Sequence, residues 1–169
     1  MMLKRTLNLC MLIVSLAAVA ATPVGAVRPT TDVIPIDFSF VPPVLSSNCG
    51  FAVTRHVQGT LTVRTFLHSS GTFSRELDQF HLVETLMANG RSLVGRTTQN
   101  VTTDLFDDGS YTVAFAGSDF RLPVPGAGIS FGSVGRLVLE FAADNTLIDV
   151  LQDVGNTASD YAAICAALA

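Results

Sequence analysis

Few side chains in this sequence have the types and spacing that catalysis or metal binding requires. The chain has three histidines, His56, His68 and His81, and its carboxylates are spread over expected strands and turns. His81 and Glu84 have the spacing of a metal-binding pair on a helix, but on a strand they point to opposite faces, and no third ligand has suitable spacing. The Gly-rich segment 124–128 lacks the glycine spacing and the following helix of a phosphate-binding loop. We therefore expect no metal site, no cofactor and no catalytic residue.

Glu84 is the carboxylate whose sequence neighbours make it a candidate for ligand binding. In a strand it shares one face with three apolar residues, Phe80, Leu82 and Leu86. If that face points inward, the carboxylate lies in an apolar interior, where it is costly unless it is paired or protonated. Arg64 and Arg96 are the candidate partners, so the predicted ligand-binding set is Glu84, Arg64 and Arg96. The alternative is a break in register that turns Glu84 to solvent.

Residues 1–26 have the features of an export signal. Lys4 and Arg5 precede an apolar run from Leu9 to Ala21, which is shorter than the roughly 20 residues that span a bilayer. Small residues at 18–20 and at 24–26 each offer a cleavage site, and Pro23, which breaks the helix, favours cleavage after Ala26; an uncleaved membrane anchor is the alternative. No later apolar run is long enough to span a membrane. We therefore expect a secreted protein without a membrane segment after signal removal.

Two cysteines, Cys49 and Cys165, remain in the mature chain. Two thiols left over in an exported protein are expected to pair as a disulfide. A redox or metal site is the alternative to a disulfide. However, there is no Cys-x-x-Cys motif, and no histidine lies close in sequence to either cysteine.

Composition and charge narrow the class of protein. The chain has 169 residues, 49% of them hydrophobic and 14% charged, with a net charge of −4. This composition excludes a disordered chain, and the acidic balance argues against a nucleic-acid-binding protein. The length fits one domain, with 27–48 as an N-terminal strand and loop and 49–169 as the rest of the same domain.

Alternating apolar and polar residues predict an all-β fold. Gly59 and several turn motifs, among them Asn89-Gly90 and Asp108-Gly109, divide the chain into about eight strands joined by hairpins. Segments 44–48 and 122–130 are expected to be loops. Antiparallel hairpins favour a closed eight-stranded β-barrel over a sandwich, because closure removes exposed edges. Spacing of Tyr161, Ile164 and Leu168 predicts a short C-terminal helix, with Ser159 or Thr157 as its N-cap.

The alternation also predicts which side chains point inward. Each of them lies on the more apolar side of its segment, and a slip of one residue sends the whole set to solvent. The set comprises Phe51, Val63, Leu82, Leu86, Val113, Phe115, Leu137, Leu139 and Phe141.

Five short motifs follow one another along the mature chain. They are Phe-x-Phe before proline at 38–40, Cys-Gly-Phe at 49–51, Asn-Gly at 89–90, Asp-Gly-Ser at 108–110 and Cys-Ala-Ala-Leu-Ala at 165–169. In this order they resemble a family of small secreted actinobacterial proteins of unknown activity. The resemblance covers nearly the whole mature chain and implies a β-barrel with its two cysteines paired. It implies no catalytic residue.

Three functional hypotheses follow. The first is a secreted, non-enzymatic, monomeric barrel that binds a small apolar ligand or an extracellular partner. The second is a barrel enzyme of the cyclase or isomerase type that uses Glu84 as acid or base. The third is a cell-envelope interaction module with a filled interior. A pocket holding Glu84 and an arginine favours the enzyme, whereas an interior filled by Phe and Leu favours the module.

Overall fold

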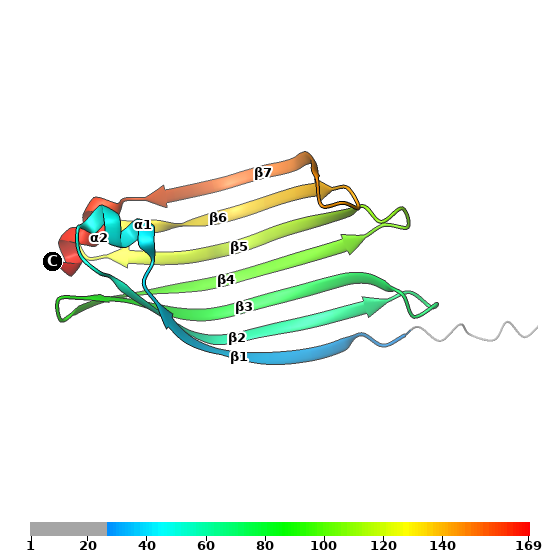
Figure 1. Cartoon of the computed structure of the whole chain (residues 1–169), viewed down its shortest axis with the longest axis horizontal. Coiled ribbons are helices and arrows are strands. Elements are labelled where there is room, and N and C mark those ends of the chain that lie inside the picture. Colours follow the sequence, from blue (N-terminus) through cyan, green and yellow to red (C-terminus); the bar gives the residue numbers. More distant parts are fainter. Residues whose placement is uncertain (1–26) are drawn as a thin grey trace, which may run out of the picture.

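Seven long antiparallel strands form a single sheet in which neighbours in sequence are neighbours in space (Figure 1). The computed structural model describes residues 27–169, so the predicted export signal and its cleavage after Ala26 lie outside the described residues. The strands are β1 (Thr30–Phe40), β2 (Thr54–Leu67), β3 (Phe73–Ala88), β4 (Arg91–Leu105), β5 (Tyr111–Val124), β6 (Gly128–Phe141) and β7 (Leu147–Ser159). Two helices complete the fold, α1 (Pro43–Cys49) and α2 (Tyr161–Leu168).

The sheet is open, so the prediction of a closed β-barrel is wrong. In residues 27–169 β1 pairs with β2 and β7 pairs with β6, and the two edges do not meet. Strands that alternate in direction bring the first and the seventh to run the same way. Closure of seven such strands would therefore need a parallel pair at the seam, whereas an even number closes with antiparallel pairs throughout.

Gly59 explains the difference between the expected and the observed number of strands. The segments that were expected to end and begin at Gly59 form one continuous strand, β2, which pairs with β3 along its whole length. Gly59 has φ of 149°, and a Cβ at this position would overlap the carbonyl oxygen of His81 on β3. The glycine therefore permits a close approach of two strands, which is a role that glycine has inside sheets as well as at breaks.

The two faces of the sheet differ in composition. We call inner the face that carries Leu86 on β3 with its register partners Arg55 and Leu93, and outer the opposite face. The strand residues that were predicted to point inward all lie on the inner face, namely Val63, Leu82, Leu86, Val113, Phe115, Leu137, Leu139 and Phe141. Phe51 precedes β2 and packs against the core. Within this set Leu86 is buried and the others are half-buried, because no second layer covers the open part of the sheet.

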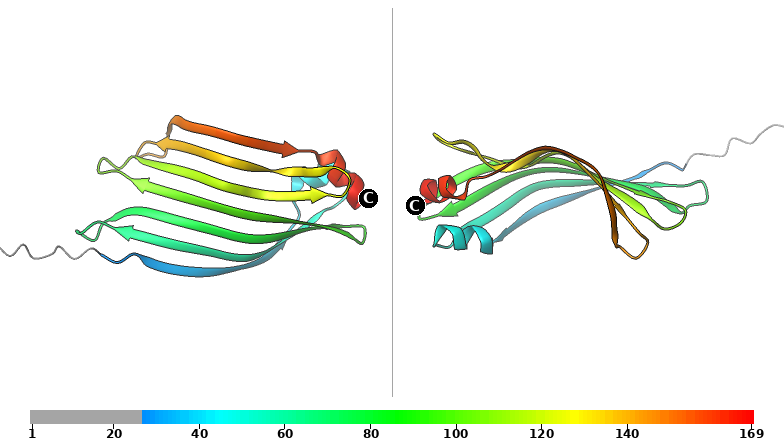
Figure 2. Two further views of the ribbon diagram at one scale, coloured as in Figure 1. Left: turned by 180° about the vertical axis from the view of Figure 1, so that it is seen from behind. Right: turned by 90° about the horizontal axis from the view of Figure 1, so that it is seen from above.

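The core lies at one end of the sheet, where both helices pack on the inner face (Figure 2). Its buried members come from both helices, from the strands and from the link after α1: Leu45, Val53, Leu86, Leu93, Phe120, Leu122, Val124, Ile164 and Leu168. Burial of these side chains, at about 25 cal/mol per Å² of apolar surface, is the main force that holds the helices to the sheet.

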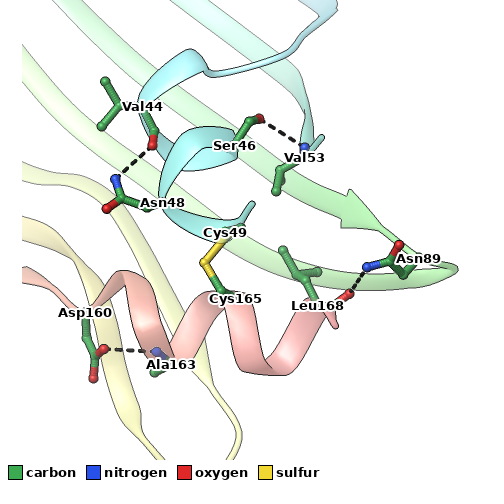
Figure 3. Close-up of a disulfide and its surroundings, with 10 residues drawn as sticks. All are labelled: Val44, Ser46, Asn48, Cys49, Val53, Asn89, Asp160, Ala163, Cys165 and Leu168. Atoms are coloured by element: carbon green, nitrogen blue, oxygen red, sulfur yellow. Dashed lines mark hydrogen bonds between the residues drawn. A yellow bond between two sulfur atoms is a disulfide. The ribbon is translucent and has the colours of Figure 1, made fainter. Parts of the chain in front are cut away.

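The predicted disulfide is confirmed and joins the two helices (Figure 3). Cys49 is the last residue of α1 and Cys165 lies in α2, 116 positions further along the chain. The side-chain amide of Asn89, in the turn between β3 and β4, also donates a hydrogen bond to the carbonyl oxygen of Leu168 (3.1 Å). The end of the sheet and α2 are thus held by covalent, polar and apolar contacts.

The helix boundaries correct two expectations. Segment 44–48, expected to be a loop, lies in α1, which begins at Pro43 and ends before Gly50. Proline is well suited to the first turn of a helix and glycine to the left-handed position after its end, where Gly50 has φ of 70°. The cap of α2 is Asp160, which accepts a hydrogen bond from the backbone N–H of Ala163 (3.0 Å), and not Ser159 or Thr157.

A bulge in β5 explains why three buried residues escaped prediction. Segment 122–130 was expected to be a loop, yet β5 continues to Val124 and β6 begins at Gly128. The register with β4 and with β6 shifts near Asp119, and from there Phe120, Leu122 and Val124 face inward instead of the odd-numbered residues. A bulge adds one residue to one strand and so reverses the alternation that follows it.

Candidate functional site

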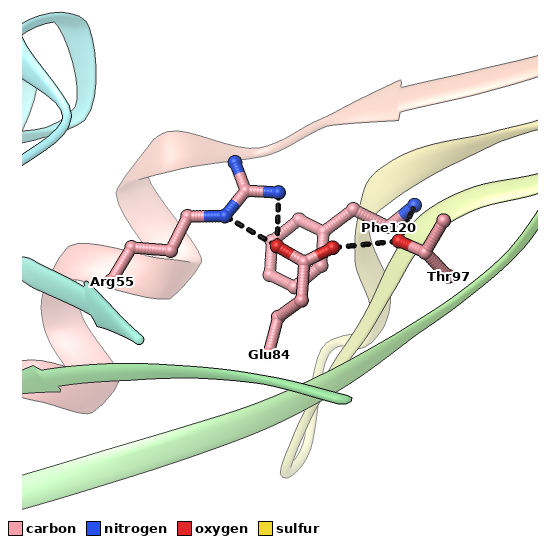
Figure 4. A network of polar contacts seen from close by, with 4 residues as sticks. All are labelled: Arg55, Glu84, Thr97 and Phe120. Atoms are coloured by element: carbon pink, nitrogen blue, oxygen red, sulfur yellow. Dashed lines mark hydrogen bonds and ion pairs between the residues drawn. The ribbon is translucent and has the colours of Figure 1, made fainter. Parts of the chain in front are cut away.

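A buried carboxylate on β3 anchors a polar network on the inner face (Figure 4). Glu84 is 2% exposed. One of its oxygens accepts hydrogen bonds from the guanidinium of Arg55 on β2, and the other accepts one from the hydroxyl of Thr97 on β4 (2.6 Å). That hydroxyl accepts a bond from the backbone N–H of Phe120 on β5 (3.0 Å). The network therefore ties four consecutive strands together.

Arg55 is held by aromatic rings as well as by Glu84. Its guanidinium carbon lies 4.3 Å from the centre of the Phe120 ring and 5.7 Å from that of Phe40 on β1. Both distances are in the range of a cation–π interaction, which is strongest where water is excluded. The arginine side chain is 25% exposed. A buried ion pair requires such additional contacts, because its Coulomb attraction alone often fails to offset desolvation.

The structure places Glu84 on the inner face, which is one of the two alternatives that the sequence left open, and gives it a different partner. Arg64 and Arg96 stand at outer-face positions of β2 and β4, so neither shares a face with Glu84. The sequence does carry a signal for Arg55, because it has the same parity as Val53 and Val57, which are buried. Its proximity to Glu84 depends on the pairing of β2 with β3, which the hairpin between them determines. A ligand-binding role for these residues stays a prediction.

A hollow beside this network occupies the uncovered part of the inner face. It has a volume of about 280 Å³, and its walls are mostly apolar, with Phe38, Phe40, Phe80 and Leu82 among them. Arg55 and Glu84 line one end of it. Arg55 also lines a separate hollow of about 170 Å³ between the helices and the sheet, so it lies at the boundary of the covered and the open parts of this face.

The hollow of about 280 Å³ beside the network, which we call the first hollow, adjoins a second hollow of about 350 Å³. Both are lined by Gln99 and Asp119, which therefore lie where the two meet. The floor of the second hollow contains three glycines without side chains, at positions 117, 135 and 155, which are partners across β5, β6 and β7. We call the two hollows together the inner groove. It runs across the sheet from an aromatic wall to a part whose lining includes the three glycines together with Asp153 and Arg136.

Asp78 is a further polar group on the inner face. It is paired in register with Val63 and Val101, and its Oδ1 atom is buried without a hydrogen-bond partner. Removal from water disfavours the charged form, so burial raises the pKa of the Asp78 carboxyl above its usual value.

The histidines do not contribute to this site. His56 lies on the outer face, where its Nδ1 is 3.0 Å from the Ser39 hydroxyl and its Nε2 is 3.7 Å from the carboxylate of Asp37. His81 is exposed on the same outer face and His68 is in the turn after β2. Among residues 27–169 no group of three or more His, Cys, Asp or Glu side chains is arranged to hold a metal ion. In the same part of the chain, no helix has the length and apolarity needed to cross a membrane.

Comparison with known proteins gives no relative: no family model, no curated protein and no solved structure matches this chain. The resemblance to secreted actinobacterial proteins therefore stays a prediction, and the functional argument depends on the geometry of the inner face.

Proposed function

We propose that this chain is an exported binding protein that holds a small, largely apolar molecule in the inner groove. The observation that carries the proposal is the combination of an aromatic wall with an anchored polar end. Ligand sites of small molecules are concave and mostly apolar, with a few placed polar groups that orient the ligand. Phe38, Phe40 and Phe80 supply the apolar wall, and Gln99 and Asp119 supply polar groups at the middle of the groove.

Export is part of the proposal. A disulfide between Cys49 and Cys165 is typical of an oxidising compartment outside the cytoplasm. The apolar run before Ala26 supports the same conclusion from the sequence.

The second candidate function is that of a cyclase or isomerase. A pocket with a carboxylate and an arginine was expected to favour this enzyme, and Arg55 and Glu84 line such a hollow. An acid or base must reach the proton that it transfers. Glu84 is 2% exposed, and both of its oxygens already accept hydrogen bonds. This geometry favours a structural and orienting role, and we place the enzyme second.

Binding can be tested with the uncharged dye Nile red, whose fluorescence rises in an apolar site. We expect the mature protein to bind it and the Phe38→Ser variant to bind about tenfold more weakly, because burial of an aromatic side chain contributes about 1.5 to 3 kcal/mol and about 1.4 kcal/mol is a factor of ten. Phe38 is 51% exposed, so its replacement should leave the core intact.

The matched control is Val33→Ser. Val33 is on the same strand, is 63% exposed and lies on the outer face. We expect it to bind the dye like the unchanged protein. Equal binding by both variants, or no binding by the unchanged protein, would contradict the proposal.

A further inference from the structure

The charged side chains of the sheet are divided between its two faces. Six carboxylates stand at inner-face positions of the strands: Asp32, Glu76, Asp78, Glu84, Asp119 and Asp153. Arg55 and Arg91 are the cations at inner-face strand positions; Glu84 neutralises Arg55, and Arg91 is exposed at the start of β4 and does not line the groove. The other arginines of the strands stand at outer-face positions: Arg64, Arg75, Arg96, Arg121 and Arg136. The inner face is therefore both apolar and acidic.

Two carboxylates of the inner groove, Asp119 and Asp153, form no ion pair in the described part of the chain, although Arg136 also lines the second hollow. The ion pairs among residues 27–169 are Arg55–Glu84, His56–Asp37 and Arg75–Asp104. Asp119 is at the junction of the two hollows, and Asp153 lines the second one. With Arg55 paired to Glu84, the remaining charged residues of the lining are Asp119, Asp153 and Arg136, which leaves an excess of negative charge. A concave surface with an excess of one charge attracts ligands of the opposite charge.

We infer that the inner groove selects a cationic amphiphile, a molecule with an apolar body and a single ammonium head. This inference rests on the proposed function and adds the chemical class of the ligand. The head lies at Asp119 beside the amide of Gln99, and the body lies along the wall of Phe38, Phe40 and Phe80. These rings add attraction, because the face of an aromatic ring is negative. An anionic amphiphile meets the same wall but is repelled by the carboxylates.

The shape of the groove suits a ligand that is charged at one end. The wall toward β1 is aromatic, whereas the lining toward β7 includes three glycine positions and carries the charged residues Asp153 and Arg136. The polar and apolar parts of a bound amphiphile thus have separate places, with Asp119 between them. Contact between the inner faces of two copies is disfavoured, since it would bring two acidic surfaces together.

The experiment measures displacement of Nile red by three amphiphiles with the same ten-carbon chain, below their micelle-forming concentrations. They are decyltrimethylammonium, decanol and decyl sulfate. We expect the cation to bind at least tenfold more tightly than the alcohol, and the sulfate to bind most weakly. Raising the salt concentration should weaken binding of the cation and leave binding of the alcohol unchanged, because salt screens charges.

Variants locate the charge effect. Asp119→Asn should weaken binding of the cation about fivefold more than it weakens binding of decanol. The matched control is Asp107→Asn, which makes the same change of charge in the exposed turn between β4 and β5 and should leave both affinities unchanged. An equal loss in both variants would mean that net charge alone, and not the groove, selects the cation, and would overturn the inference.

The outcomes separate the two proposals. If the cation and the alcohol bind with equal affinity, or if the sulfate binds most tightly, the inference is wrong and the apolar binding site stands. If neither Nile red nor any of the three amphiphiles binds, both the site and the inference are wrong.

Discussion

Glu84 illustrates how one residue can organise a sheet that lacks a second layer. Its carboxylate receives hydrogen bonds from Arg55 and Thr97, and Thr97 in turn binds the backbone of Phe120. A charged group this deeply buried is stable only while its partners remain, so the network is sensitive to any change in one member. Because the network spans β2 to β5, its loss should affect the sheet as a whole.

The first prediction concerns Glu84→Gln. The substitution leaves the guanidinium of Arg55 without its counter-charge in a largely desolvated place, so we expect unfolding to become easier by about 2 kcal/mol. The control is Glu76→Gln, on the same face of β3 but outside the ion pairs of residues 27–169. It should change stability by less than about 0.5 kcal/mol. Urea denaturation measures both, and equal stability of the two variants would contradict the network's importance.

The second prediction concerns Asp78→Asn and pH. Burial raises the pKa of this carboxyl in the folded state above its value in the unfolded chain. The folded state therefore binds more protons between these two pKa values, and the free energy of unfolding falls as the pH rises through them. We expect Asp78→Asn to have a higher Tm than the unchanged protein at pH 7, and the difference in Tm to disappear near pH 3. Asp107→Asn is the control for the loss of one negative charge. A difference in Tm that grows as the pH falls would contradict the predicted direction of the pH dependence.

At the scale of elements, the two short helices depend on contacts that are distant in sequence. α1 has seven residues and α2 has eight, and helices of this length are unstable alone in water. Ile164 and Leu168 are buried against the sheet, and the disulfide connects α2 to α1. The helices therefore form as part of the core and not before it.

The third prediction concerns the disulfide. Its loss frees a loop of 116 positions in the unfolded chain, and the chain-entropy model assigns about 4 to 5 kcal/mol to such a loop. We expect a Cys49→Ser, Cys165→Ser double variant to melt at a clearly lower temperature than the unchanged protein. The unchanged protein with reductant should melt like the variant. Mass spectrometry of the exported chain should find two protons fewer than the free thiols require; two free thiols would contradict the pairing.

At the scale of the whole molecule, the open sheet leaves two long edges with unpaired backbone groups. Exposed edges invite pairing with other chains, and charged side chains are one means of preventing it. β1 carries Asp32, Asp37 and the internal Pro35, and β7 carries Asp149 and Asp153. The edges are thus acidic on both sides of the sheet, which is consistent with the predicted monomer by charge repulsion.

The fourth prediction distinguishes the open sheet from a closed barrel by amide hydrogen exchange. In β1 and β7 every second N–H points away from the sheet, so about half of their amides should exchange quickly. The amides of β3 and β4, which have partners on both sides, should be protected. Protection of all amides in β1 and β7 at every protein concentration would contradict the open edges, whereas protection that disappears on dilution would indicate pairing between copies.

The sequence by itself determined the all-β class, the inward set from Val63 to Phe141, the cysteine pair and the C-terminal helix. These follow from local alternation, from turn residues and from the count of thiols, none of which needs a register between distant strands. The tertiary structure alone decided that the sheet stays open, that Arg55 partners Glu84, and that Phe120 turns inward. The physical reason is that closure, the partners and the bulge all depend on how strands that are distant in sequence align, which local alternation does not specify. The role of Gly59 likewise became clear only in the folded sheet, where it lies inside β2 against the backbone of His81 on β3.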